Sequence, residues 1–174
     1  IRQLLPATIE VQGEKQNYSI PVVQIEDAPR FEWRGFMLDA SRHFWNKKEV
    51  KHVLDLMSLY KLNKFHWHLS DDQGWRIEIK KYPELTQIGA QRKEPVIGRN
   101  SGKYDGKPYG EGMFYTQDEI RDVIAYAQER FITIIPEIDL PGHQLAAITT
   151  YPDLGCTGGP YEVWTQWGVS DDVI

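Results

Sequence analysis

The stretch KFHWHLSDDQGW, residues 64–75, decides the fold of this chain. Apolar side chains occupy every second position from Phe65 to Leu69, and histidines occupy the positions between them, which is the period of a β-strand. Two adjacent aspartates and a second tryptophan follow at once. Ordinary core packing does not ask for this combination, so the stretch predicts a strand that ends in a functional site.

Two further strands are expected on either side of this one. The runs GFMLD, residues 35–39, and FITIIPEID, residues 131–139, are short, apolar and end in carboxylates. Between the first two strands apolar residues recur in steps of three and four, which is the period of a helix that buries one face; they are Val50, Val53, Leu54, Met57 and Tyr60.

A second helix is expected to start at Thr116. The residues Thr116 to Glu119 have the Ser/Thr-x-x-Glu form of a capping box, and apolar residues at helical spacing follow. Strand, helix, strand, helix, strand is the order that builds a parallel sheet with right-handed crossovers. The fold class is therefore α/β.

Each predicted strand ends in acidic and histidine residues, in the segments 39–43, 68–72 and 137–143. The carboxyl ends of parallel strands open on one edge, so these segments should converge there. The segment 73–115 is long for a connection between a strand and a helix, and it should lie at the same edge, where ligands bind. The last residues, 151–174, are expected to form another long loop.

Three side chains are the main candidates for the site. Arg42 follows a strand end and can offer a planar fork of donors to hydroxyls or carboxylates. Asp71 and Asp72 are adjacent, so their side chains should diverge and only one should face the site. A carboxylate that accepts a hydrogen bond from an imidazole fixes its tautomer, and Asp71 with His143 is the candidate pair for such a relay. Separate structural hydrogen bonding of the two residues is the alternative that the sequence by itself favours.

His66 and His68 permit a different interpretation, because two histidines two residues apart on a strand point the same way and could share a divalent metal. A metal-dependent barrel hydrolase would need further ligands, for which Asp39, Asp71 and His143 are loose candidates. Hydrogen bonding of both histidines inside the barrel is the interpretation that the sequence favours.

The aromatic residues suggest the substrate. Trp75, Trp164 and Trp167 are predicted to lie in loops, and flat indole faces stack on sugar rings while carboxylates, arginine and histidine bind the hydroxyls. Carbohydrate is therefore the expected ligand, although loop tryptophans often only anchor their loops.

Composition excludes other classes. The chain has 174 residues, 41% of them hydrophobic, and a formal net charge of −5, which argues against a nucleic-acid partner. The single Cys156 cannot form an internal disulfide. No run approaches the roughly 18 apolar residues of a membrane span, and the first residues do not have the pattern of a signal peptide.

Three motifs together resemble the signatures of the family 20 glycoside hydrolases, the β-N-acetylhexosaminidases: WRGFMLDASRHF, KLNKFHWHLSDDQGWR and IIPEIDLPGH. The resemblance implies a (β/α)8 barrel that removes terminal β-linked N-acetylglucosamine or N-acetylgalactosamine. It also implies a substrate-assisted retaining mechanism, in which the 2-acetamido oxygen of the sugar attacks C1. By this resemblance Arg42 holds the sugar's 3- and 4-hydroxyls, while Asp71 and His143 form a relay to a catalytic glutamate. It implies no cofactor and no metal.

The sequence departs from the family in one respect. The catalytic pair of the family lies in a Gly-Gly-Asp-Glu motif, whereas the only Asp-Glu step here is Asp118-Glu119, inside the capping box. A complete barrel also takes roughly 200 to 250 residues or more. We therefore expect a piece of a longer enzyme, inactive alone: residues 1–27 as the tail of a preceding small α/β domain, with the end of a helix and a strand, and residues 28–174 as the first three β/α units of the catalytic barrel.

Two alternatives stay open, a non-catalytic carbohydrate-binding protein on the same scaffold and the metal-dependent hydrolase. An isolated three-strand piece would expose sheet edges and apolar surface, so poor stability is expected. The glycan substrate implied by the resemblance favours an extracellular, periplasmic or lysosome-like location, and the sequence does not indicate the oligomeric state.

Overall fold

The computed structural model describes residues 2–10, 13, 17–99 and 101–174, and it divides into two compact units, Ile1–Glu32 and Trp33–Ile174. In the first unit the structure has two 3₁₀ turns, η1 (Arg2–Leu4) and η2 (Ala7–Glu10). The strand expected near the end of the segment 1–27, in the run YSIPVVQIEDAPRF, is not formed, because the described residues there make no strand pairing. The assignment of residues 1–27 to a preceding domain stays a prediction.

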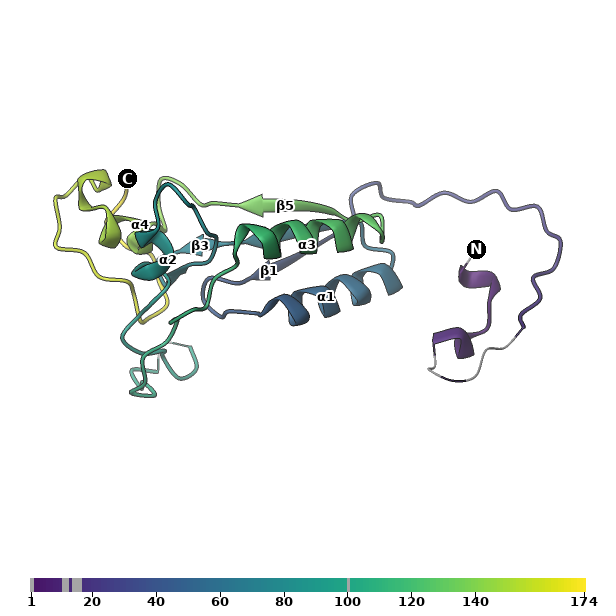
Figure 1. The fold of residues 1–174 in the computed structure, drawn as a ribbon, viewed down its shortest axis with the longest axis horizontal. Helices are drawn as coiled ribbons and strands as arrows, with labels where there is room; N and C mark the ends of the chain where they lie inside the picture. Colours follow the sequence, from purple (N-terminus) through teal and green to yellow (C-terminus); the bar gives the residue numbers. More distant parts are fainter. Residues whose placement is uncertain (1, 11–12, 14–16, 100) are drawn as a thin grey trace. The chain divides into compact units, whose positions relative to one another are not determined.

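The second unit is built on a parallel sheet of three strands in the order β1-β2-β5. The strands are β1 (Gly35–Asp39), β2 (Lys64–His68) and β5 (Thr133–Glu137). Figure 1 shows them running side by side. This confirms the three strands, their parallel direction and the α/β class that the sequence predicts.

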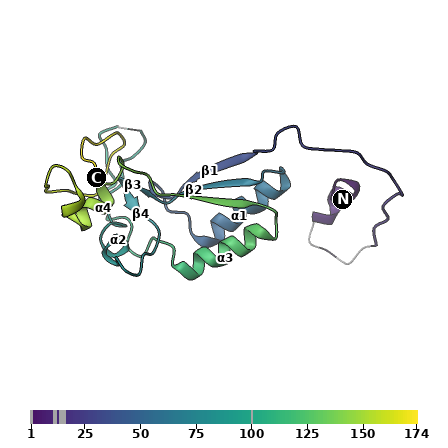
Figure 2. The same ribbon diagram turned by 90° about the horizontal axis from the view of Figure 1, so that it is seen from above.

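Two helices make the crossovers and cover one face of the sheet (Figure 2). They are α1 (Lys47–Leu59) and α3 (Gln117–Gln128). Each begins with a capping box, on Asn46 and on the predicted Thr116. Tyr60 does not belong to the buried face of α1, because it is the C-cap residue and is 73% exposed.

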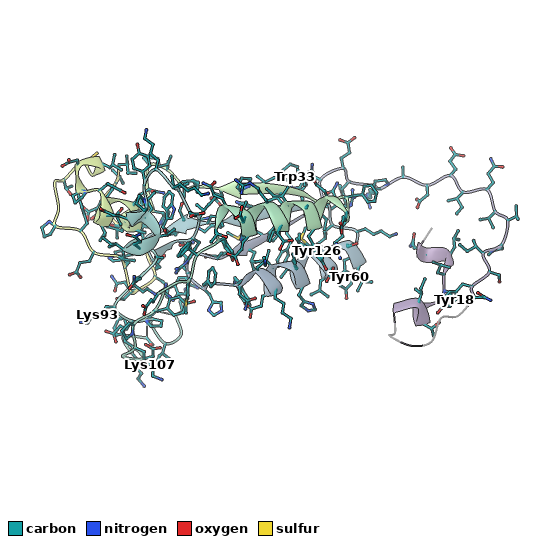
Figure 3. The ribbon with its side chains drawn as sticks, viewed as in Figure 1. Tyr18, Trp33, Tyr60, Lys93, Lys107 and Tyr126 are labelled. Carbon is teal, nitrogen blue, oxygen red and sulfur yellow. The ribbon has the colours of Figure 1, made fainter. Side chains whose placement is uncertain are left out.

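The core lies between this sheet face and the helices. Phe65, Trp67 and Leu69 are buried there, on the side of β2 that the alternation predicts. The two helices are also joined outside the core by a hydrogen bond from the Tyr126 hydroxyl on α3 to Asp55 on α1 at 2.9 Å. Tyr126 is labelled in Figure 3. The packing of the two helices on the sheet thus fixes the positions of the carboxyl ends of the three strands relative to one another.

The remaining elements gather at that carboxyl end (Figure 1). A short antiparallel hairpin, β3 (Ser70–Asp71) and β4 (Gly74–Trp75), follows β2 directly. The helices α2 (Glu84–Gln87) and α4 (Leu145–Thr150) and the turn η3 (Pro152–Leu154) complete this layer. None of the described helices is long and apolar enough to cross a membrane.

Candidate active site at the carboxyl ends of the strands

The strand register brings three ionisable residues side by side. Asp39 is paired with His68, and His68 with Glu137, at the last positions of β1, β2 and β5. The predicted convergence of the three strand ends is therefore confirmed. These residues form the base of the candidate site.

Asp71 lies just above this base, in the hairpin that follows β2. Its side chain is 1% exposed, and its Oδ2 is 2.7 Å from Nε2 of His68 and 2.7 Å from Nη1 of Arg42. Oδ1 accepts the backbone N–H of Asp72 at 2.7 Å. The short turn back into β4 holds the carboxylate in this position.

Arg42 is held by the turn that follows β1. Oδ1 of Asp39 accepts the backbone N–H groups of Ser41 and Arg42, both at 2.9 Å, while Oδ2 of Asp39 lies 3.1 Å from Nη1 of Arg42. Nε of Arg42 donates to the Gln73 side chain at 2.9 Å. Among the described residues Nη2 makes no hydrogen bond, so it is the donor that this arginine can offer to a ligand.

His143 reaches the site from the loop after β5. Its backbone has φ 55°, a left-handed conformation that is uncommon for a residue with a side chain and often marks a functional position. Nδ1 lies 2.9 Å from Oδ2 of Asp72 and 3.3 Å from Oδ1 of Asp71. The structure thus brings Arg42, Asp71 and His143 together.

The expectation that Asp71 and Asp72 diverge is wrong. The chain turns at this point, so both carboxylates face the His143 imidazole. The hydrogen bond to Asp72 raises the pKa of His143, against the opposing effect of burial. Burial raises the pKa of Asp72, although the bonds from His143 and from the Leu145 backbone N–H oppose this.

His66 and His68 both point at the same carboxylate. Oε2 of Glu137 accepts from Nε2 of His66 and from Nδ1 of His68, the latter at 2.7 Å. Both ring nitrogens of His68 are bonded to carboxylates. Within the described part of the chain, the acidic and histidine residues close enough to share an ion are Asp71, Asp72 and His143, a different set from the predicted histidine pair.

A cavity of about 200 Å³ adjoins Arg42, and Gln73, Tyr109 and Trp167 help to line it. Trp167 is 40% exposed, so its indole is accessible beside the arginine. Trp75 instead lies in β4, is 7% exposed and donates from its ring to the Ile77 carbonyl at 2.6 Å. The prediction that Trp75 lies in a loop is therefore wrong. Trp164 packs against the buried cluster around Leu145 and Ile148.

Two buried arginines support the site from the long segment. Arg92 donates to the backbone carbonyls of Gln73 at 2.9 Å and of Arg42 at 2.8 Å, and its guanidinium lies 4.2 Å from the Tyr109 ring centroid. Arg76 is fully buried and bonds four backbone carbonyls, which belong to Ala40, Ser41, Ala90 and Met113. Burial lowers the pKa of Arg76 to about 10, so it stays charged at neutral pH.

The sequence does not predict that these two arginines belong to the site. Their partners are backbone carbonyls, which every residue has, so no acidic partner in the sequence indicates the contacts. The strand ends did predict that acidic and histidine residues meet here. A parallel β/α sheet whose strand ends share a rim of carboxylates, histidines and one arginine has the arrangement in which α/β enzymes place their functional groups.

Comparison with known proteins specifies the family. The model of the glycosyl hydrolase family 20 catalytic domain matches residues 31–174, and the chain belongs to this family. A β-hexosaminidase of Porphyromonas gingivalis is 47% identical over 172 residues, which are 98% of this chain and 21% of that protein. An N,N'-diacetylchitobiase of Vibrio harveyi is 41% identical over 138 residues, 76% of this chain and 16% of its own length.

Solved structures of the same family are similar to this chain. The N-acetyl-β-hexosaminidase of Streptomyces plicatus in complex with thio-NAglucal superposes with a TM-score of 0.80 at 39% identity, over 99% of this chain and 32% of that one. The exo-β-N-acetylglucosaminidase of Vibrio harveyi in complex with N-acetylglucosamine gives 0.65 at 54% identity, over 74% of this chain and 20% of that one. The chain thus spans between a sixth and a third of the relatives it matches.

Proposed function

We propose that these residues belong to a β-N-acetylhexosaminidase that hydrolyses terminal, non-reducing β-linked N-acetylglucosamine or N-acetylgalactosamine from glycans or chitooligosaccharides. The three strands and two helices are the first part of its (β/α)8 barrel. Family membership and the names of the relatives support this proposal. The observation that carries it is the meeting of Arg42, Asp71 and His143 at one rim.

In this proposal Arg42 binds the sugar hydroxyls. The carboxylates of Asp39 and Asp71 hold Nη1, and Gln73 holds Nε, so the guanidinium is oriented before the substrate arrives. Nη2 then donates to a ring hydroxyl. A donor that is already oriented loses little conformational entropy on binding.

His143 serves a proton relay. Because Nδ1 faces Asp71 and Asp72, the other ring nitrogen, Nε2, is left to face the group that protonates the leaving oxygen. The raised pKa of His143 extends the pH range in which Nε2 carries a proton and can hold that group. The general acid itself, and the group that orients the acetamido oxygen for attack on C1, belong in this proposal to the rest of a longer polypeptide.

An activity assay tests the proposal. We expect the longer polypeptide to release the chromophore from a chromogenic N-acetylglucosaminide, and the 174-residue chain to release none. Arg42→Ala in the longer polypeptide should lower kcat/KM roughly 10- to 100-fold, because a hydrogen bond to a charged group contributes about 1.5–3 kcal/mol. Arg121→Ala is the matched control, since Arg121 forms an exposed pair with Asp118 on α3.

A non-catalytic carbohydrate-binding protein is the second candidate, favoured by the accessible Trp167 beside Arg42. Binding of N-acetylglucosamine by the longer polypeptide without turnover would support it and contradict the proposed hydrolase. Turnover by the 174-residue chain alone would contradict the assignment of the acid to other residues.

A further inference from the structure

His68 lies under the candidate site without reaching the space where a ligand would bind. It is 3% exposed. Its Nδ1 lies 2.7 Å from Oε2 of Glu137 on β5, and its Nε2 lies 2.7 Å from Oδ2 of Asp71 in β3. The imidazole therefore spans two carboxylates on neighbouring elements, at the base of the group that contains Arg42 and His143.

This geometry determines the charge of the ring. An ionised carboxylate only accepts hydrogen bonds, so a ring that bonds two of them must donate from both nitrogens. Only the imidazolium has both protons. His68 is thus a buried cation that is paired with carboxylates at both ends, as a buried charge requires.

The alternative is that a carboxyl group carries the proton and His68 is neutral. Each of the two oxygens facing His68 also lies against a second donor: Oε2 of Glu137 against His66, and Oδ2 of Asp71 against Nη1 of Arg42 at 2.7 Å. Donors of this kind stabilise the ionised carboxylate. The protons between the ring and the carboxylates therefore belong to the ring.

The charges around the ring agree with this assignment. Three carboxylates face it, those of Asp39, Asp71 and Glu137, while Arg42 opposes it with Nη1 at 3.3 Å from Nε2. Burial alone would lower the pKa of His68, but the hydrogen bonds to Asp71 and Glu137 outweigh it and raise the pKa to about 9.

We propose that His68 is a positioning residue for the proposed hydrolysis: a permanent imidazolium that fixes Oδ2 of Asp71 and so leaves Oδ1 turned toward His143. The bond to Glu137 anchors the ring to β5. The position of the Asp71 carboxylate is therefore fixed by the sheet, through His68, and not only by its own short hairpin. The role in hydrolysis rests on the proposed function, whereas the charge of the ring does not.

The first experiment measures the charge directly. Imidazole ¹⁵N NMR on the longer polypeptide, with His68 assigned through His68→Gln, should show two protonated ring nitrogens from pH 5.5 to 8. A neutral tautomer of His68 at pH 7 would overturn the proposal. This readout does not depend on activity, so it still decides the charge of His68 if the wild-type enzyme shows no turnover and the proposed function fails.

The second experiment measures the consequence for Asp71. His68→Gln can bond only one of the two carboxylates and has no charge, so we expect kcat to fall roughly 10- to 100-fold with KM within about twofold. His66→Gln is the matched control, because the glutamine amide can still donate to the same Glu137 oxygen, and His66 makes no bond to Asp71 in the described structure. It should change kcat less than about twofold, and equal kcat values in the two variants would overturn the positioning role.

A third variant serves if His68→Gln does not fold. Glu137→Gln keeps the size of the side chain and an oxygen that can accept from the ring, but it removes the charge that holds the second proton. The pKa of His68 should then fall clearly in the NMR titration, and kcat should fall with it. An unchanged titration of His68 in Glu137→Gln would contradict the inference.

Discussion

The Nδ1 of His143 lies between two buried carboxylates, and these two contacts determine the orientation and the pKa of the ring. Asp72 is the nearer partner at 2.9 Å, and Asp71 is at 3.3 Å. Asp72 also accepts the Leu145 backbone N–H at 3.2 Å, so it is tied to the start of α4, whereas Asp71 is tied to Arg42. The two aspartates therefore contact the same imidazole from different sides, one tied to α4 and one tied to Arg42.

Replacing each aspartate in turn separates these two contributions. We expect Asp72→Asn to lower the pKa of His143 more than Asp71→Asn does, because the hydrogen bond to Asp72 is the main cause of the raised pKa. Asp71→Asn should instead lower kcat/KM more, since Asp71 also holds Arg42. Histidine NMR titration and steady-state kinetics on the longer polypeptide measure the two effects, and a larger pKa change in Asp71→Asn would contradict this division.

The same bond predicts a pH dependence of stability. A histidine whose pKa is raised by folding stabilises the folded state fully below its unfolded pKa of about 6.5, and this stabilisation is lost as the pH rises through the folded value. Unfolding midpoints of the wild type should therefore fall relative to those of Asp72→Asn as the pH rises above about 6.5. A constant difference between the two proteins from pH 5 to 9 would show that His143 does not contribute in this way.

Some residues of the candidate site can be predicted from the sequence, and others cannot. Arg42, Asp71 and His143 lie at strand ends in motifs of a family, so both position and resemblance indicate them. The sequence does not indicate Asp72, because adjacent residues on an extended strand point to opposite faces. That rule fails here because β3 ends at Asp71 and the chain turns at once.

At the scale of elements, the long segment between β4 and α3 is fastened to the site by Arg92. In its described residues the segment carries one short helix, α2, so its position depends on such contacts. Arg92 bonds the carbonyls of Arg42 and Gln73, and the Tyr109 hydroxyl on the same segment accepts the Phe44 backbone N–H at 2.8 Å. The segment thus helps to hold the turn that carries Arg42.

Arg92→Met should release this turn while keeping the apolar stem of the side chain. We expect KM for the N-acetylglucosaminide to rise roughly 5- to 50-fold, since two hydrogen bonds from a charged donor are lost. Lys93→Met is the matched control, because Lys93 is the exposed neighbouring cation on the same segment (Figure 3). Equal KM values in the two variants would show that Arg92 does not position the site.

The periods of two and of 3.6 predicted the strands and helices correctly, because each element buries one face. The alternation of residues 65–69 and the capping box at Thr116 are local signals, and the structure confirms both. The contacts of Arg76 and Arg92 are not local. They join backbone carbonyls far apart in the chain, and such partners have no signature in the residues that provide them.

At the scale of the whole second unit, the described structure covers one face of the sheet with the two helices α1 and α3. Both β1 and β5 have one edge without a strand partner in the described structure. An apolar groove of about 320 Å³ runs beside α3, lined by residues that include Ile124, Ile132 and Ile134. In the proposed barrel a further helix after β5 would pack into this groove and cover it.

Placing a charge in this groove tests whether the rest of a barrel covers it. Ile124 is 36% exposed in the 174-residue chain, so Ile124→Glu should change its unfolding free energy by less than about 0.5 kcal/mol. In the longer polypeptide the same change should cost about 2–4 kcal/mol, because the carboxylate would be buried without a partner.

The control for this comparison is Ala125→Glu, an exposed neighbour on the same helix, which should be nearly neutral in both proteins because glutamate and alanine both favour helices. Urea unfolding of the four variants and the two parents measures all of these differences. If Ile124→Glu is as harmless in the longer polypeptide as Ala125→Glu, the groove stays open to solvent there, and the proposal that these strands begin a closed barrel is wrong. A large loss confined to Ile124→Glu in the longer polypeptide is the result that a covering element produces, since the net charge changes equally in the control and the helix propensities of the three residues differ by less than about 0.7 kcal/mol.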